Sequence, residues 1–468
     1  MTTMMAIAQD TLFVREKAKT EFKMQTSTAK EAGWRLSGYN ISTDAPEGEG
    51  KIIANLYTGS IAVYSVLECY LLSVFERLDE DHPMIKLFAE RGLIVNCDEL
   101  AAIDAAGRMS SGAAGPVSLT ICPTMGCNFD CPYCFEQHGQ GLMSIEVQDD
   151  VVKLAGRLLE VSRARKLNVS WFGGEPLTAP DVIGSLSARL IALAEEHGAE
   201  YSASITTNGY LMTEENIAML EKAKVSSAQV TLDGIGEAHD RTRHLAGGGG
   251  TFKVITDNLR SRRIPFNVTI RHNVSADNAS EAEKLRAFVK ELAKESGNRI
   301  GFAPALLRDS AAAAERKTEL HLLEGDEAAE VDAAWVCHAS SVSRPLFCGA
   351  QRLWSVCIDD KGRLYKCWEI LDDPAKSFGA AADWDPEKPL LSADAPDLLS
   401  GFINSASPLD DEECRACIWL PHCQGGCPYQ RLYMERSCPG YRHRPDIFLR
   451  TMYEKIVSRD GKKDEEKD

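Results

Sequence analysis

Three cysteines stand close enough together in the sequence to bind one metal centre. Cys127, Cys131 and Cys134 lie in a single short segment. Iron–sulfur clusters are held by cysteine thiolates, and three thiolates on a four-iron cluster leave one iron open for a substrate or cofactor. A structural zinc ion is the alternative, because it takes four ligands and His138 could supply the fourth. We favour the cluster, since the elements that follow this segment fit it better than they fit zinc.

A second group of cysteines lies in the C-terminal third of the chain. The sequence has 15 cysteines and no evident export signal. Clustered cysteines are then better explained as metal ligands than as disulfides, which need an oxidising compartment. Zinc, which also binds CxxC pairs, is the alternative here too. The candidate ligands are Cys348, Cys357, Cys367, Cys414, Cys417, Cys423, Cys427 and Cys438.

Net charge and hydropathy argue against several function classes. The formal net charge is −17, whereas nucleic-acid-binding proteins need a basic surface. No apolar stretch of the sequence is long enough to span a bilayer. We therefore expect a cytoplasmic protein that has neither a membrane nor a nucleic acid as its partner.

From Val117 onward, short apolar strands alternate with longer amphipathic helices. This alternation predicts an α/β fold, in which a parallel sheet with helices outside it curls into a partial (β/α)6 barrel. The polar motifs fall where strands end, which is the edge of such a sheet that carries active sites. The expected strands are Ser118–Cys122, Leu167–Phe172, Tyr201–Thr206, Ala228–Leu232, Phe266–Arg271 and Arg299–Phe302, and the expected helices are Val147–Leu159, Val182–Glu196, Glu214–Lys224 and Ser280–Lys294.

Residues 1–110 have a different pattern, which predicts a small α+β domain of winged-helix type. Two strands would flank a turn at Tyr57-Thr58-Gly59, and two helices and a closing strand would follow. The expected elements are strands at Lys51–Asn55, Gly59–Val63 and Gly92–Val95, and helices at Val66–Leu78 and Pro83–Arg91.

Composition also divides the rest of the chain. Gly107–Gly115 is rich in small residues and predicts a linker. We expect the barrel over residues 111–310, a cysteine-rich domain over 311–450, and a charged tail over 451–468.

The first cysteine motif resembles that of the radical S-adenosylmethionine (SAM) superfamily. It is Cx3CxxC, with Tyr133 before its last cysteine. The resemblance implies that the three thiolates hold a [4Fe–4S] cluster whose open iron chelates the amino and carboxylate groups of SAM. In that family an electron from the cluster cleaves SAM, and the resulting 5′-deoxyadenosyl radical takes a hydrogen atom from the substrate. Cys122 lies outside the spacing, and we expect it to be a buried strand residue.

The same resemblance assigns SAM contacts to the next two strand ends. Gly173, Gly174 and Glu175 look like the family's GGE element, which binds the amino group of SAM; alone, they would be an ordinary βα turn. Thr207 and Asn208 end the third strand and suit hydrogen bonds to ribose and carboxylate groups. An Asn-Gly turn is the alternative for that pair.

Asp233 and Arg243 belong to a segment similar to the S-x-D-G…H-D-x-x-R element of peptide-modifying radical SAM enzymes, with Thr231 in place of the serine. By that analogy Asp233 contributes to the SAM site. Arg243 would act in catalysis by pairing with the SAM carboxylate or with an active-site acid. The alternative is a helix-capping Asp240 with surface arginines.

The C-terminal cysteines resemble the SPASM extension of that superfamily. Its pattern is Cx9–15Gx4C, a gap, Cx2Cx5Cx3C, a gap and C, and Gly362 supplies the glycine. The resemblance implies two auxiliary [4Fe–4S] clusters. The first would be held by Cys348, Cys367 and Cys427, and the second by Cys414, Cys417, Cys423 and Cys438.

Cys357 is a candidate fourth ligand of the first auxiliary cluster. If it is not a ligand, that cluster keeps an open site for a substrate thiolate; Cys337 and His338 are the fallback ligands. Glu369 lies close to where the family places an acid near its substrate. It is a candidate general base, with a plain surface carboxylate as the alternative.

Enzymes with this extension mostly modify peptides, so we expect a precursor peptide with a leader as the substrate. Residues 57–61 and 91–95 look like the opening region of thioether-forming maturases of ribosomal peptides. In those enzymes the N-terminal domain binds the leader by adding a strand to its sheet. The implied reaction is hydrogen abstraction followed by a thioether or carbon–carbon crosslink, with an electron donor such as flavodoxin or ferredoxin.

Two alternatives stay open. A sulfatase-type maturase would oxidise a residue to formylglycine, although such enzymes usually begin directly at the barrel. A non-catalytic iron–sulfur or zinc scaffold would bind peptides without cleaving SAM.

Overall fold

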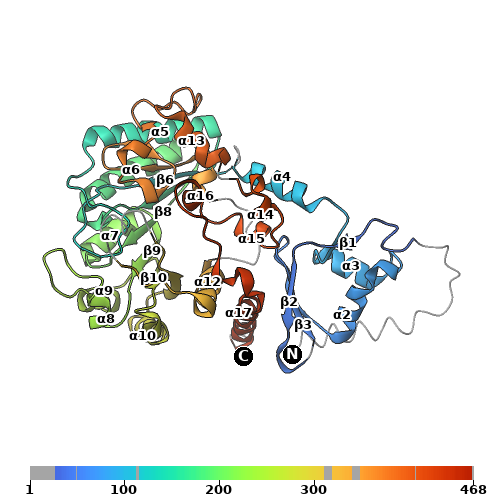
Figure 1. Ribbon diagram of the computed structural model, residues 1–468. Helices are drawn as coiled ribbons and strands as arrows, with labels where there is room; N and C mark the ends of the chain where they lie inside the picture. Colours follow the sequence, from blue (N-terminus) through green and yellow to red (C-terminus); the bar gives the residue numbers. More distant parts are fainter. Residues whose placement is uncertain are drawn as a thin grey trace.

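The computed structural model describes residues 27–48, 50–111, 115–309, 319–339, 348–405 and 407–465. Within these residues, no helix is both long and apolar enough to cross a membrane. Figure 1 shows a large sheet with its helices, and a smaller N-terminal sheet that lies beside the last helix of the chain.

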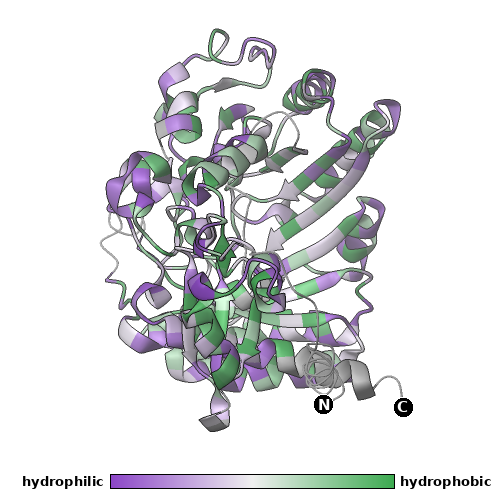
Figure 2. Ribbon diagram, turned by 90° about the vertical axis from the view of Figure 1, so that its right-hand side faces the viewer, coloured by the Kyte–Doolittle hydropathy of each residue, from purple (hydrophilic) through white to green (hydrophobic). Residues whose placement is uncertain are grey.

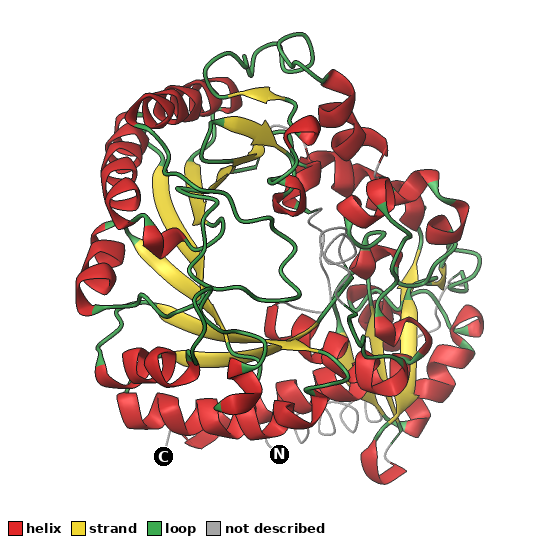
Figure 3. Cartoon of the chain, turned by 60° about the vertical axis from the view of Figure 1, so that its left-hand side comes forward, coloured by secondary structure: helices red, strands yellow, loops and turns green. Residues whose placement is uncertain are grey.

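In the described chain, nine strands form one open sheet in the order β11-β10-β9-β8-β7-β6-β12-β13-β14. The strands from β6 to β11 are parallel, which confirms the predicted partial barrel. Figure 3 shows them as a curved wall with helices on its outer side. Their bounds are β6 (Val117–Ile121), β7 (Lys166–Trp171), β8 (Glu200–Thr207), β9 (Val225–Thr231), β10 (Asn267–Val274) and β11 (Ile300–Leu306).

Side chains cap two of the helices that cover this wall, α5 and α7. Ser144 accepts a hydrogen bond from the backbone N–H of Val147, and Thr213 accepts one from that of Asn216, which satisfies donors that a helix start leaves unpaired. Apolar residues line the strands, and polar residues are more frequent on the helices (Figure 2). The helices are α5 (Ile145–Ser162), α6 (Pro180–Glu196), α7 (Glu214–Lys222), α8 (Glu237–Asp240), α9 (Phe252–Ser261) and α10 (Ala282–Ser296).

Three strands from the cysteine-rich region extend the same sheet beyond β6. β12 (Ser355–Ile358) pairs in parallel with β6, so that Cys357 lies opposite Thr120. β13 (Arg363–Tyr365) and β14 (Gly379–Ala380) follow in antiparallel pairing. The C-terminal cysteines are therefore joined to the barrel by a strand ladder, which the sequence did not indicate.

The N-terminal part contains the strands and helices that the sequence predicts, and three more elements. Ser65 starts α2 with a reciprocal pair of hydrogen bonds to Glu68, a strong helix-start arrangement. The unexpected elements are β1, which pairs with β5, β2, which completes an antiparallel sheet of order β2-β3-β4, and α4. The elements are β1 (Arg35–Leu36), β2 (Asn40–Asp44), β3 (Lys51–Asn55), β4 (Ile61–Tyr64), α2 (Val66–Ser73), α3 (Pro83–Glu90), β5 (Ile94–Val95) and α4 (Glu99–Ser111).

Two boundaries differ from the sequence-based expectation. Helix α4 continues to Ser111, through the start of the expected linker, because its alanine-rich sequence favours a helix; residues 112–114 of that linker lie outside the described part. Helix α17 (Pro445–Glu465) runs through most of the expected charged tail. Phe448 and Leu449 near its start are fully buried, so apolar packing holds the helix.

The N-terminal sheet is anchored to the C-terminal region. Side chains alternate along a strand, so Ile52 and Ala54 of β3 point to one face and Ile53 to the other. Ile52 and Ala54 share a core with residues of α17 and of α12 (Gly325–Ala339), whereas Ile53 packs with α3. Figure 1 shows α17 beside β2 and β3.

Candidate functional site

The three cysteines of the first motif lie on a loop between β6 and α5, here called the triad loop (residues 122–144). Backbone hydrogen bonds close this loop on itself, from Gly139 N to Met125 O at 3.1 Å and from Met143 N to Pro123 O at 2.9 Å. A β-bridge between Phe129 and Leu245 ties it to the segment after α8. Cys122, at its start, is fully buried, as expected.

The thiols of the triad loop are mostly withdrawn from solvent. Cys131 is 7% exposed. Burial raises the pKa of the Cys127 thiol to about 12, and Cys131 and Cys134 add to the rise, so the three sulfurs lie within range of one another's charge. The ring nitrogen Nε2 of His138 lies 3.6 Å from the sulfur of Cys134. Within the described residues, no three His, Cys, Asp or Glu side chains converge on a single metal ion.

The two glycines after β7 are required by the triad loop itself. A Cβ added to Gly174 would lie 2.2 Å from the backbone oxygen of Gly126, and one added to Gly173 would lie 2.3 Å from that of Thr124. Both distances are far inside van der Waals contact, so only glycine allows the two loops to approach this closely. The family resemblance predicts that these glycines contact SAM. In the structure, their close contacts hold the triad loop against the end of β7.

Glu175 joins three neighbouring segments from a fully buried position. Its backbone N–H donates to Gly126 O at 2.8 Å. Its carboxylate accepts hydrogen bonds from Thr207 Oγ1 at 2.7 Å and from Asn208 N at 2.6 Å. Burial raises the pKa of Glu175, although these donors counteract the rise. Asn208 in turn donates to Asn128 of the triad loop at 2.7 Å.

Asp233 and Arg243 meet at Tyr133, the aromatic residue of the cysteine motif. The Tyr133 hydroxyl donates to Asp233, and Arg243 Nη1 donates to that hydroxyl oxygen at 2.7 Å. Burial alone would lower the pKa of Arg243, but Tyr133, Cys131 and Asp233 raise it well above its ordinary value. Arg243 is therefore a buried cation that contacts the Tyr133 hydroxyl, which in turn donates to Asp233. Its predicted pairing with the SAM carboxylate or with an active-site acid stays a prediction. Its Nε is buried without a hydrogen-bond partner in the described residues.

The segment between Asp233 and Arg243 is held by His239, whose contacts the sequence did not reveal, and by Asp240. His239 is fully buried, accepts a hydrogen bond from Asp233 N through Nδ1, and lies 3.0 Å from Thr251 Oγ1 through Nε2. Burial, helped by Arg243, lowers the pKa of His239 well below 6.5, so the ring is neutral. Asp240 accepts from the backbone N–H groups of Thr251 and Phe252. It therefore caps α9, as the alternative interpretation predicted, whereas Arg243 is not a surface residue.

The cysteines predicted to hold the first auxiliary cluster lie around the β12–β13 hairpin, and we call them the hairpin set. Burial raises the pKa of the Cys367 thiol well above its ordinary value, and Cys357 and Cys348 add to the rise. Burial also raises the pKa of Cys427, with Cys348 contributing. These mutual effects indicate that the fold gathers Cys348, Cys357, Cys367 and Cys427. The side chains of Cys337 and His338 lie outside the described part.

The hairpin set lies beside the triad loop. The backbone N–H of Gln137 donates to the carboxylate of Asp372 at 3.0 Å. An aromatic stack runs from Phe135 to Phe172 and on to Trp368, with ring centroids 6.3 and 5.7 Å apart. These residues follow Cys134, β7 and Cys367, respectively, so the stack bridges the two cysteine regions.

Glu369 is half-buried next to this stack and is not a plain surface carboxylate. Burial raises its pKa, Arg271 lowers it and Asp372 raises it. It also contributes to the rise in the pKa of Glu136, a buried triad-loop carboxyl whose pKa burial raises to about 8. A group of acids with raised pKa values therefore lies between the triad loop and the hairpin set.

The four cysteines predicted to hold the second auxiliary cluster line one cavity, and we call them the four-cysteine set. The cavity measures about 20 Å³ and opens to solvent. Two short helices and the segment from Arg436 to Arg442 line it, and Trp419 and Leu420 close it on the side of the N-terminal sheet. The set is Cys414, Cys417, Cys423 and Cys438, and the helices are α14 (Glu412–Arg415) and α15 (Leu420–Cys423), which α16 (Pro428–Tyr433) follows.

The donor sets fit the groups that the sequence implies. Thiols are the preferred ligands of iron–sulfur clusters. The four-cysteine set lines one cavity, and the thiols of the triad loop and of the hairpin set lie within range of one another's charge, but in the described residues no three of them stand close enough to share one metal ion. The triad loop offers three thiols beside a buried arginine with an unused donor, which suits a cofactor that carries a carboxylate. Such an arrangement can hold an open-site cluster at the carboxyl ends of the barrel strands.

Comparison with known families agrees with this geometry. Residues 121–289 match the model of the radical SAM superfamily. The matched range contains the triad loop, both glycines and the segment from Asp233 to Arg243.

Two curated relatives match parts of the chain. Over 170 residues it is 30% identical to the AdoMet-dependent heme synthase of Methanosarcina barkeri (strain Fusaro / DSM 804), a match that covers 36% of this chain and 46% of that protein. Over 191 residues it is 27% identical to the cysteine-type anaerobic sulfatase-maturating enzyme of Clostridium perfringens (strain 13 / Type A), covering 38% and 49%, respectively. The chain spans about half the length of these two relatives.

One solved structure similar to this chain is that of native anSMEcpe with bound AdoMet and Cp18Cys peptide. The TM-score is 0.54 at 20% sequence identity, and the match covers 74% of this chain and 99% of that one. At this identity the likeness shows a shared fold.

Proposed function

Residues 121–289 form a radical SAM domain, and on that premise we propose that the chain is a radical SAM enzyme that modifies a peptide. The observation that carries the proposal is the position of the triad loop. It lies at the carboxyl ends of the barrel strands and directly against the hairpin set, through the Gln137–Asp372 hydrogen bond and the Phe172–Trp368 stack.

Cys127, Cys131 and Cys134 would hold a [4Fe–4S] cluster, and SAM would bind beside it. When bound, this pair supplies reductive cleavage of SAM and a radical that takes a hydrogen atom from the substrate. The groups that we propose to contact SAM are Arg243, whose Nε has no partner in the described residues, and the strand-end residues Gly173, Gly174, Glu175, Thr207, Asn208 and Asp233.

The chain's own residues position this site in two ways. Glu175 and the glycine pair hold the triad loop against β7 and β8. The Asp233–Tyr133–Arg243 chain fixes the aromatic ring of the motif and keeps a guanidinium charge out of water. A cation held in a dry site interacts strongly with a ligand carboxylate, and that is the role we propose for Arg243.

The two C-terminal sets would hold auxiliary [4Fe–4S] clusters. In the hairpin set, Cys357 would be the fourth ligand beside Cys348, Cys367 and Cys427, because its thiol and that of Cys348 both raise the pKa of Cys367. In the four-cysteine set, the shared cavity supports ligation by all four thiols.

Glu369 is the proposed general base. It lies next to the exposed ring of Trp368, between the triad loop and the hairpin set. A base with a raised pKa can accept a proton from a substrate thiol or amide near neutral pH. An electron donor such as flavodoxin or ferredoxin would supply the electrons.

The N-terminal sheet is the proposed docking site for the leader of the precursor peptide. β4 is the last strand of its sheet, and an edge strand can pair with an added one. Next to it, Val66, Leu67 and Tyr70 of α2 are 69%, 61% and 61% exposed. Apolar side chains of an extended peptide would pack on these three residues.

The proposed reaction is formation of a thioether or carbon–carbon crosslink in that peptide. A formylglycine-forming maturase is the second candidate, because the shared fold covers 99% of anSMEcpe, whose structure contains a bound peptide. The two differ in mass change. Each crosslink removes one pair of hydrogens, whereas conversion of cysteine to formylglycine removes one pair of hydrogens and also replaces the sulfur with an oxygen from water.

Release of 5′-deoxyadenosine tests the enzymatic proposal. Anaerobically reconstituted protein with dithionite and SAM should release it, and the Cys127→Ala, Cys131→Ala, Cys134→Ala triple variant should not. Cys97→Ala, at an exposed cysteine outside all three sets, serves as the matched control and should behave as wild type. Equal release from the triple variant would refute the proposal, and a brown wild-type protein that leaves SAM intact would favour the scaffold.

Peptide binding tests the docking site separately. Leu67→Lys should weaken binding of a fluorescent leader peptide by about tenfold, since it places a charge on an apolar contact. It should leave peptide-independent release of 5′-deoxyadenosine unchanged. Leu391→Lys, at a leucine that is 87% exposed elsewhere on the chain, is the control. Unchanged leader binding by Leu67→Lys would exclude this face.

A further inference from the structure

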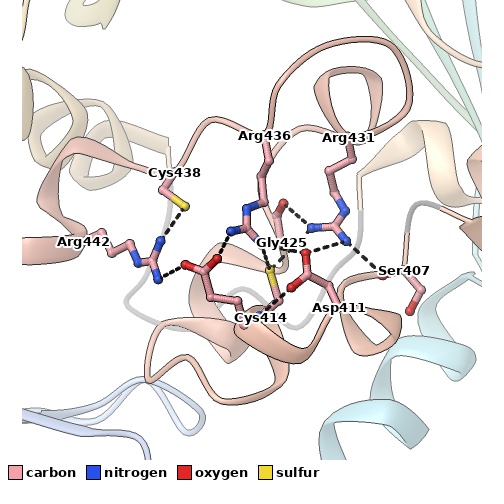
Figure 4. A network of polar contacts seen from close by, with 9 residues as sticks. Ser407, Asp411, Cys414, Gly425, Arg431, Arg436, Cys438 and Arg442 are labelled. Atoms are coloured by element: carbon pink, nitrogen blue, oxygen red, sulfur yellow. Dashed lines mark hydrogen bonds and ion pairs between the residues drawn. The ribbon is translucent and has the colours of Figure 1, made fainter.

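Three arginines donate hydrogen bonds to the sulfurs of the four-cysteine set or lie against them (Figure 4). Arg442 Nη1 lies 3.1 Å from Cys438 Sγ, and Arg436 Nη1 lies 3.3 Å from Cys414 Sγ. Arg431 Nη1 lies 3.4 Å from Cys414 Sγ and 3.4 Å from the backbone oxygen of Gly425. The arginine side chains are between 10% and 24% exposed, so they form a half-buried wall of the cavity.

Two carboxylates hold these arginines in place. Glu413 accepts from both Arg436 and Arg442. Asp411 accepts from Arg436 at 2.6 Å and pairs with Arg431 at 3.5 Å. The guanidinium group of arginine is always charged in proteins, and these ion pairs enforce its orientation toward the sulfurs.

The negative charge of a cluster bound by four thiolates would explain why three arginines are held against these sulfurs. Three arginines and two carboxylates lie around the four-cysteine set, so the net charge next to these cysteines is positive. The hairpin set instead has Lys366 beside it, whose ammonium group is bound by the backbone oxygens of Arg352 and Ser355. A four-thiolate cluster is anionic, and each electron that it accepts adds another negative charge without a proton. Nearby cations and N–H···S hydrogen bonds favour the reduced form.

We propose that Arg431, Arg436 and Arg442 form a cage that raises the reduction potential of the second auxiliary cluster, and so sets the direction in which it exchanges electrons. This inference rests on the proposed function, because it takes the four-cysteine set to hold a cluster. The three arginines are positioning residues that act through the ligand sulfurs.

Redox titration followed by electron paramagnetic resonance tests the cage on full-length, reconstituted protein. The signal of the second auxiliary cluster is identified by its loss in Cys417→Ala. Arg436→Gln and Arg442→Gln should each shift the midpoint potential of that signal downward, and the double variant should shift it further. Arg444→Gln is the matched control, since Arg444 follows the same segment but pairs with Asp446 and Asp326. It should leave the potential unchanged.

Arg436→Lys provides a second measurement if Arg436→Gln fails to retain its cluster. Lysine keeps the charge but cannot reach the sulfur and two carboxylates at once, so the expected downward shift is smaller than that of Arg442→Gln. Unchanged potentials in all arginine variants, or an equal shift in Arg444→Gln, would overturn the cage. A wild-type protein without the Cys417-dependent signal would instead overturn the proposed cluster.

Discussion

The triad loop and the four-cysteine set both gather thiols, yet the chain surrounds them differently. Around the triad loop, the cation Arg243 reaches the motif through the hydroxyl of Tyr133, and close backbone contacts at Gly173 and Gly174 hold the loop. Around the four-cysteine set, arginines contact the sulfurs directly and ion pairs hold the arginines. The first arrangement holds the triad loop in place, whereas the second places positive charge against the sulfurs.

If the two sets hold the clusters that we propose, this difference follows from the number of ligands. A three-thiolate cluster must leave room for a cofactor, so donors that crowd its sulfurs would compete with that cofactor. A four-thiolate cluster takes no further ligand, so the protein can surround its sulfurs with cations. The comparison therefore predicts that a substitution in one region changes the properties of that region and leaves those of the other unchanged.

The largest effect is expected from Gly174→Ala. The added methyl group would overlap the backbone of Gly126, where neither partner can move away, and should cost about 2 to 3 kcal/mol of unfolding free energy. Iron content should fall from about 12 to about 8 atoms per chain, as one of three clusters is lost. Gly401→Ala, at a helical glycine with nothing within 4 Å of the added atom, is the control. Loss of the Cys417-dependent signal in Gly174→Ala would contradict the separation of the two regions.

Tyr133→Phe should have the next largest effect. It removes the hydroxyl between Asp233 and Arg243, which leaves both buried charges short of a partner and should lower the unfolding free energy by about 1 to 3 kcal/mol. SAM affinity should fall while the potential of the four-cysteine cluster stays constant. Chemical denaturation and equilibrium SAM binding measure the two effects, and wild-type SAM affinity in this variant would argue against a role for the Tyr133–Arg243 pair.

Asp411→Ala perturbs the opposite region. Asp411 caps α14 by accepting from Cys414 N at 3.0 Å, so its loss should cost about 1 kcal/mol of unfolding free energy. Asp411→Asn keeps a capping oxygen and should recover most of that stability. Because Asn lacks the charge that holds Arg436, both variants should alter the potential of the four-cysteine cluster, and neither should reduce 5′-deoxyadenosine release in the absence of peptide.

The smallest effect concerns pH. Burial holds the pKa of His239 well below 6.5 in the folded chain, whereas the unfolded chain takes up a proton near that value. The contribution of His239 to stability is therefore complete above about pH 6.5 and is lost as the pH falls. His239→Asn, which does not titrate, should show a weaker decline in unfolding free energy between pH 7.5 and pH 5.5. Parallel pH profiles for the two proteins would show that His239 does not titrate on unfolding.

Much of the site could be predicted from local sequence. The spacing of Cys127, Cys131 and Cys134 placed three thiols on one loop because they share one short segment. The six parallel strands were visible because each is a compact apolar run that the core buries. The four-cysteine set was predictable for the same reason, since its members lie within one compact stretch of chain.

Other features depend on residues that are far apart in the sequence. Tyr133 and Arg243 are separated by 110 positions, and the sequence offered a surface location for Arg243 as an open alternative. The glycine pair suggested a ligand contact, but its tightest contacts are with the backbone of the triad loop. Most of the expected tail belongs to α17, because Phe448 and Leu449 near the start of that helix pack in one core with residues of β3 and α12.

The sequence by itself determined which residues are candidate metal ligands and which segments become the six parallel strands, because ligand chemistry and hydropathy act over a few neighbouring residues. Only the tertiary structure decided that β12 adds Cys357 to the barrel sheet beside β6, and that three arginines turn toward the sulfurs of the four-cysteine set. Strand pairing and ion pairs bring together groups from distant segments, and their geometry is set by the packing of the whole chain.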